Sequence, residues 1–87
     1  MSVVILSHRV ENFESWKKIY DADLTRRKEA GLREITCGPK MGDPNLIYMV
    51  FETDDLDKAR RMIENEELKE VMRKAGVTGH LEVVMIK

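Results

Sequence analysis

The sequence predicts an α+β domain in which helices cover one face of a four-stranded antiparallel sheet. Three apolar segments, within residues 2–9, 45–53 and 80–87, are too short for buried helices and do not alternate with polar residues. In the middle segment Leu46, Tyr48 and Val50 project to one side, and Ile47, Met49 and Phe51 project to the other. Both faces of such a strand must be covered. Amphipathic helical stretches separate the strands and give the order β-α-β-β-α-β.

The first half of the chain carries clear boundary signals. A strand is expected over Ser2–Arg9, and Asn12 is a favourable N-cap for a long helix running to Ala30. Gly31 stands where a helix commonly ends in the left-handed conformation. The weaker strand Leu32–Gly38 contains adjacent charged residues, which suit the edge of a sheet.

The second half is bounded by turn and cap residues. Gly38–Pro44 contains two glycines and two prolines and is expected to form a turn or short loop. Thr53 or Asp54 is expected to cap a second helix, which Asn65 divides into two pieces. The last strand is expected over His80–Lys87.

This order of elements is the ferredoxin-like, or split βαβ, arrangement, in which right-handed crossovers place both helices on one face of the sheet. The first and third strands are then central, and the second and fourth are edges. The other face is still apolar on three strands and exceeds what monomers usually expose. A second copy of the sheet is the simplest cover, so we expect a homodimer formed face to face through the sheet.

Composition limits the function classes. The chain of 87 residues is expected to be one domain, spanning residues 1–87. Its net charge of -1 disfavours a dedicated nucleic-acid binder. The single cysteine, Cys37, has no partner for an internal disulfide, which favours a reducing compartment. No stretch has the length of a signal peptide core or a membrane span, so we expect a cytoplasmic protein with no membrane partner.

Several short motifs spread over the chain carry a family resemblance. They are His8-Arg-Val10, Asn12-Phe13-x-x-Trp16-Lys17-x-x-Tyr20, Arg27-x-x-x-Gly31, Asp43-Pro-Asn45, Asp54-Asp55 followed by Ala59-Arg60, and Glu67-Leu68-x-x-x-Met72-x-x-Ala75-Gly-Val77-x-Gly79. With these motifs the chain resembles the small single-domain proteins of the dimeric α/β-barrel superfamily, home of the antibiotic-biosynthesis monooxygenases. The resemblance implies the dimeric fold. It implies no single activity, because the superfamily includes cofactor-free oxygenases, haem-degrading enzymes, isomerases and ligand sensors. The Asn/Trp/His constellation of the haem-degrading branch is not matched, so no cofactor is expected.

A stripe on the first helix is the main candidate for ligand binding. Phe13, Trp16, Tyr20, Asp23 and Arg27 recur at spacings of three and four and therefore share one face. Large amphipathic aromatics followed by an acid and a base suit a cavity whose apolar walls hold an organic ligand while polar groups orient it. The alternative is structural: the aromatics belong to the core, and Asp23 and Arg27 form an ordinary i,i+4 ion pair.

Two histidines are candidates for the mouth of that cavity. His8 ends the first strand and His80 begins the last, at the same end of the sheet in the expected topology. A neutral imidazole there could take a proton from a phenol or an activated carbon acid. The alternative is that each histidine is structural or faces solvent. A metal would need a third ligand such as Glu82, and no recognised spacing supports one, so no metal site is predicted.

Two functional hypotheses remain open. In the first, the dimer binds a small aromatic or polycyclic molecule and acts as a cofactor-independent monooxygenase, or as a cyclase or isomerase. His8, with Tyr20, would be the catalytic base, while Phe13, Trp16, Asp23, Arg27 and His80 would bind the ligand. In the second, the dimer binds a ligand or a partner protein without catalysis, because no pair of residues forms a recognised catalytic motif.

Overall fold

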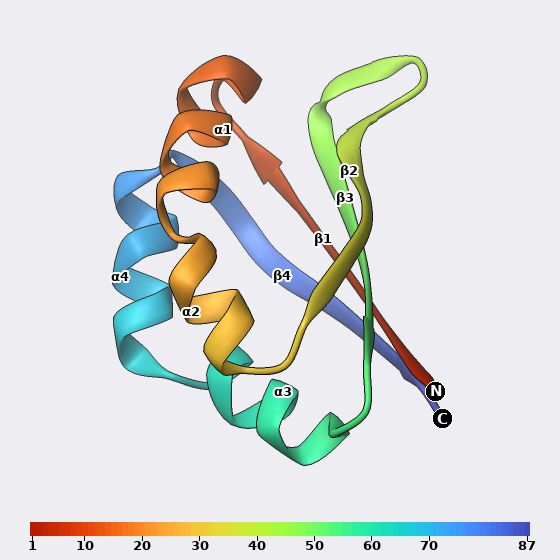
Figure 1. Cartoon of the computed structure of the whole chain (residues 1–87). Coiled ribbons are helices and arrows are strands. Elements are labelled where there is room, and N and C mark those ends of the chain that lie inside the picture. Colours follow the sequence, from red (N-terminus) through yellow and green to blue (C-terminus); the bar gives the residue numbers. More distant parts are fainter.

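A computed structural model describes residues 1–87. In chain order its elements are β1 (Ser2–Val10), α1 (Phe13–Ala22), α2 (Leu24–Glu29), β2 (Arg33–Lys40), β3 (Asp43–Thr53), α3 (Leu56–Ile63), α4 (Glu66–Lys74) and β4 (Val77–Ile86). The strands form one antiparallel sheet in the order β2-β3-β1-β4, with all helices on one side of it (Figure 1). The ferredoxin-like α+β fold is confirmed, and so is the central position of the first and third strands. No helix is both long and apolar enough to cross a membrane.

The first helical region differs from the prediction of one continuous helix. Asn12 does cap α1, since its side chain accepts a hydrogen bond from the Ser15 backbone N–H at 2.9 Å. At Asp23, however, the helix ends, and α2 starts at the next residue. Asp23 leaves helical geometry, with a φ of -95° and a ψ of 18°, and its carboxylate binds the Arg26 guanidinium at 3.0 Å.

The β2–β3 connection is also tighter than predicted. Gly38–Pro44 is not a loop, because β2 continues to Lys40, which pairs with Asp43 at the start of β3. Only Met41 and Gly42 form the turn, with Gly42 at a φ of 86°, where a side chain would be strained. β2 is an edge strand, so the proline in it removes no hydrogen bond that a further strand would need.

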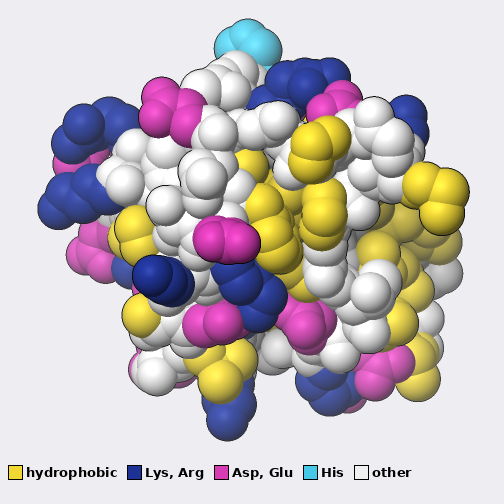
Figure 2. Space-filling view, turned by 90° about the horizontal axis from the view of Figure 1, so that it is seen from above, with side chains coloured by type: hydrophobic (Ala, Val, Ile, Leu, Met, Phe, Trp, Pro, Cys, Tyr) yellow, Lys and Arg dark blue, Asp and Glu magenta, His cyan; other side chains and the backbone are white.

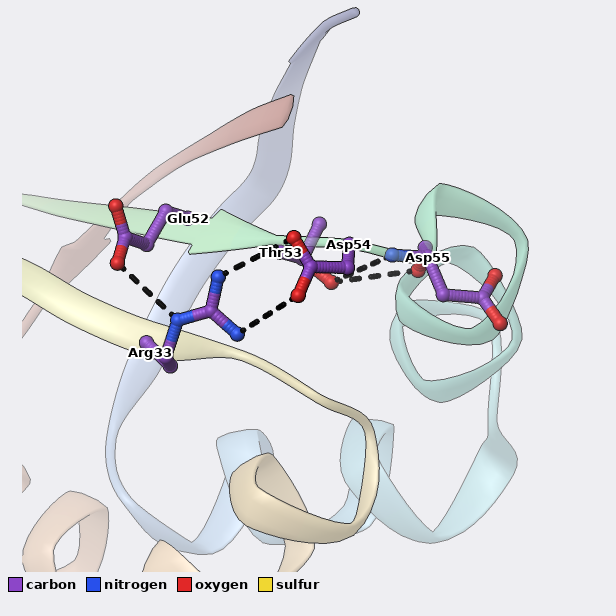
Figure 3. A network of polar contacts seen from close by, with 5 residues as sticks. All are labelled: Arg33, Glu52, Thr53, Asp54 and Asp55. Carbon is purple, nitrogen blue, oxygen red and sulfur yellow. Dashed lines mark hydrogen bonds and ion pairs between the residues drawn. The ribbon is translucent and has the colours of Figure 1, made fainter. Parts of the chain in front are cut away.

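The second helical region is divided as predicted, but its first cap is Asp55 rather than Thr53 or Asp54. The Asp55 carboxylate accepts from the Lys58 N–H at 3.0 Å. Thr53 fixes the position of this cap, because its hydroxyl oxygen accepts a hydrogen bond from the Asp55 backbone N–H at 3.1 Å (Figure 3). Asn65 caps α4 as expected.

The two faces of the sheet are covered differently. Toward the helices lie the buried side chains of the core, among them Val4, Leu6, Ile47, Met49 and Phe51. On the opposite face Ile5 on β1 pairs with Val50 on β3 and with Val84 on β4, which gives an apolar row across three strands. In Figure 2 hydrophobic side chains gather on the right, the side on which Figure 1 places the face of the sheet away from the helices. The chain itself leaves this second face uncovered.

Candidate functional site

A cavity of about 60 Å³ lies between the sheet and the helices. Strands β1, β3 and β4 form its floor, and α1, α2, α3 and α4 form its walls. The lining residues are Leu6, His8, Trp16, Ile19, Tyr20, Asp23, Arg27, Met49, Phe51, Met62, Leu68, Val71, Met72, Ala75 and Leu81. The space suffices for a few water molecules or part of one ring. Three methionines line it, and their flexible side chains allow the walls to adapt to a larger ligand.

His8 is the most deeply buried titratable group of the cavity. It follows Val4 and Leu6 on the helix-facing side of β1 and is only 3% exposed. Its ring meets Trp16 edge-on, with ring centroids 5.4 Å apart, and its Nδ1 has no hydrogen-bond partner. Burial lowers the pKa of His8 from its ordinary value of 6.5, so the imidazole is neutral at neutral pH. The Nδ1 atom is fully buried, so a bound molecule reaches it only where the cavity walls move aside; a neutral imidazole nitrogen then accepts a proton or a hydrogen bond.

The predicted stripe on the first helical region forms a stack of planar groups. The rings of Trp16 and Tyr20 are stacked with centroids 4.7 Å apart, and Phe13 lies on the other side at 5.9 Å from Trp16. The Arg27 guanidinium lies over the Tyr20 ring, 3.6 Å from its centroid. Trp16, Tyr20 and Arg27 line the cavity, whereas Phe13 supports the stack from outside the lining. Arg27 lies seven residues, about two helical turns, beyond Tyr20 and therefore on the same side of the helical region.

The Tyr20 hydroxyl points to the edge strand. It donates a hydrogen bond to the Glu34 carboxylate on β2, at 2.5 Å. Burial, together with this hydrogen bond, raises the pKa of Tyr20 far above its ordinary value. Burial beside Glu34 also raises the pKa of the nearby Cys37 thiol to about 11, so this thiol is not a ready nucleophile. The ring of Tyr20 therefore lines the cavity, while its hydroxyl is hydrogen-bonded to Glu34.

Arg27 is a buried cation without an acidic partner. It is 8% exposed, and Nη1 donates to the Tyr20 backbone carbonyl at 2.7 Å. The predicted alternative of an i,i+4 pair with Asp23 is wrong, because Asp23 binds Arg26 instead. No carboxylate lies within ion-pairing distance of Arg27.

His80 is not brought to this cavity. The pairing of β1 with β4 is interrupted by a bulge, in which residues 79–81 stand opposite His8 alone. Gly79 has a φ of 74° and permits this distortion. Leu81 then lines the cavity, whereas His80 is exposed. No group of three or more His, Cys, Asp or Glu side chains is arranged to hold a metal ion.

The fold is shared with several solved structures. No family model and no curated protein matches the sequence. A protein from Nitrosomonas europaea assigned as an antibiotic biosynthesis monooxygenase matches with a TM-score of 0.71 at 13% identity, over 100% of this chain and 97% of that one. SnoaB, a cofactor-independent oxygenase from Streptomyces nogalater, matches with a TM-score of 0.71 at 13% identity, over 99% and 90%.

A third match is an uncharacterised NIPSNAP domain protein from Burkholderia xenovorans, with a TM-score of 0.69 at 18% identity, over 100% of this chain and 93% of that one. These matches span essentially the full length on both sides. The chain therefore has the fold of the antibiotic-biosynthesis-monooxygenase-like proteins, as the sequence resemblance implied.

Proposed function

We propose that this chain is a homodimer whose cavity binds a small aromatic molecule and oxygenates it without a cofactor. His8 carries the proposal, because a neutral imidazole with an unpartnered ring nitrogen lies beside a cavity whose lining is mostly apolar. Such a position is costly for a polar atom unless a ligand or water completes its hydrogen bond. The likeness to SnoaB, described as a cofactor-independent oxygenase, supports this choice of reaction.

In the proposed reaction His8 takes a proton from a phenol or an activated carbon acid. The resulting anion gives one electron to dioxygen, and the two radicals recombine to form a peroxide at the substrate carbon. Protonated His8 returns its proton to this peroxide anion, and loss of water with the hydrogen remaining on that carbon gives a carbonyl group. One oxygen atom thus enters the product and the other leaves as water. The same proton transfer without dioxygen would support an isomerase or cyclase. Tyr20 contributes its ring rather than its hydroxyl, which Glu34 binds.

The proposed dimer uses the face of the sheet away from the helices. Its centre is the apolar row of Val50, Ile5 and Val84, and ion pairs lie toward its two ends. At one end Arg33 binds Glu52 at 3.1 Å and Asp54 at 3.4 Å (Figure 3). At the other end Arg9 binds Asp43 at 3.0 Å. An apolar centre with a polar rim is the usual anatomy of a protein interface.

Oxygen uptake with a panel of phenols and enolisable aryl ketones tests the reaction. His8→Gln should reduce turnover by about 100-fold or more, because a general base typically contributes that factor. His80→Gln is the matched control, since it removes the exposed histidine and should keep full turnover. Undiminished turnover in His8→Gln would reject the role of His8 as base.

A second candidate function is ligand binding without catalysis. The observation favouring it is that Nδ1 of His8 has no partner that orients the ring, and the Tyr20 hydroxyl is already bound. Catalytic histidines are commonly oriented by a second group. A ligand that saturates the cavity of the wild-type protein with no oxygen uptake and no isomerised product would favour this function.

A further inference from the structure

Two charged side chains line the cavity, and only one of them has an ionic partner. The Asp23 carboxylate is bound by Arg26 at 3.0 Å, and Arg26 also approaches Glu67 at 3.6 Å. Arg27, on the other side of Tyr20, has no such partner. The cavity therefore holds one positive charge that the protein does not neutralise.

The contacts of Arg27 leave most of its hydrogen-bonding capacity unused. A guanidinium carries five N–H donors, and only one bond is formed, from Nη1 to the carbonyl oxygen of Tyr20 near the end of α1. That bond and the Tyr20 ring stabilise the cation at a helix C-terminus. They do not supply a negative charge, and a buried cation without one is costly. None of the remaining donors is a fully buried atom without a partner, so water or a small molecule reaches them.

Arg27 and His8 stand at opposite ends of one chain of contacts. His8 meets the edge of Trp16, Trp16 stacks on one face of Tyr20, and Arg27 covers the other face. Both ring faces of Tyr20 are thus covered, so a ligand meets the stack at its edges and otherwise contacts aliphatic walls such as Leu68 and Met72. A molecule filling this space presents one end to His8 and the other to Arg27.

We propose that the ligand is an aromatic acid, whose carboxylate binds Arg27 and whose reactive position faces His8. This inference rests on the proposed binding function and adds the chemical class of the ligand. A carboxylate matches the fork of donors on a guanidinium and replaces the missing negative charge. It also explains why an arginine occupies a position on the stripe where leucine would serve packing better.

Binding is measured by NMR through the indole N–H of Trp16, the only tryptophan in the chain, which lines the cavity. The probes are benzoate and 1-naphthoate, each compared with its neutral primary amide of nearly the same shape. We expect the acids to bind at least about tenfold more tightly than the amides, as for hydrogen bonds that gain a charge. Equal affinity of acid and amide would overturn the inference and leave the proposed binding function standing. Absence of saturable binding by all four probes would overturn both.

Variants then assign the effect to Arg27. Arg27→Gln should weaken binding of the acids by about tenfold or more and leave the amides nearly unchanged. Lys28→Gln removes the same charge from the next residue, which is exposed, and should change the affinity for neither the acids nor the amides. If Arg27→Gln does not fold, Arg27→Lys keeps the charge with fewer donors and should bind the acids with intermediate affinity. Wild-type affinity for the acids in a folded Arg27→Gln protein would overturn the inference.

Discussion

Along β1 the two faces of the sheet receive different polar residues. On the helix-covered face Val4 and Leu6 are followed by His8, a polar side chain placed inside the apolar layer. On the other face Val3 and Ile5 are followed by Ser7 and then by Arg9, whose guanidinium reaches Asp43 at the rim. Polar atoms are inexpensive at a solvated rim and costly inside a core. The covered face is therefore suited to a small ligand with polar groups, whereas the open face is suited to a second protein surface.

The strongest test of this contrast places a charge on the open face. Val84, which is 51% exposed, lies in the apolar row that we assign to the dimer. Val84→Glu should convert the dimer to a monomer, because the symmetric contact would bury an unpaired carboxylate twice, at several kcal/mol each. Light scattering coupled to size-exclusion chromatography measures the mass.

Leu24→Glu is the control for that experiment. It adds the same charge to an exposed apolar residue on α2, on the helix side of the molecule, and should leave the dimer intact. A monomeric wild-type protein at micromolar concentration would reject the proposed dimer, and a dimeric Val84→Glu protein would reject this face as its interface.

The next test compares the two faces with one residue type. Ile47 lies under the helices and is fully buried, while Ile5 is partly exposed on the open face. Ile47→Ala should reduce the free energy of unfolding by about 2–5 kcal/mol at any protein concentration, through lost burial and a cavity. Ile5→Ala should cost less in the monomer, roughly 1 kcal/mol, and more where the dimer forms. Urea unfolding at two protein concentrations distinguishes the two variants. If both lost the same free energy of unfolding at both concentrations, the proposed difference between the faces would be contradicted.

Local patterns were enough to predict most of the fold. The apolar strands and the caps at Asn12 and Asn65 are properties of neighbouring residues, and the structure confirms them. The break at Asp23 was missed because an aspartate inside an amphipathic pattern is not by itself a helix end. The turn within Gly38–Pro44 was predicted, but its length was overestimated, because the glycines and prolines suggest that the strands end before them.

The candidate site likewise has some features that local sequence patterns predict and others that depend on contacts between distant strands. Helical spacing predicts that Trp16, Tyr20 and Arg27 lie together, which the structure shows. The contact of Tyr20 with Glu34 depends on the register of the edge strand, which no short motif encodes. The outward position of His80 depends on a bulge at Gly79, which the sequence pattern placed before the strand rather than inside it.

The smallest expected effect is the pH dependence of stability that comes from His8, the titratable group buried on the helix-covered face of the sheet. Because burial lowers the pKa of folded His8, the unfolded chain takes up the proton first as the pH falls below about 6.5. The free energy of unfolding should therefore be level above that pH and decrease below it, until folded His8 is itself protonated. Two carboxyl groups with a lowered pKa, Asp43 and Glu70, reduce stability mainly below pH 5, as their carboxylates take up protons in the unfolded chain. His8→Gln should abolish the slope between neutral pH and pH 5, measured by urea unfolding, whereas His80→Gln should keep it. A slope that survives in His8→Gln would show that another group causes it, and would remove the evidence that the buried imidazole is neutral.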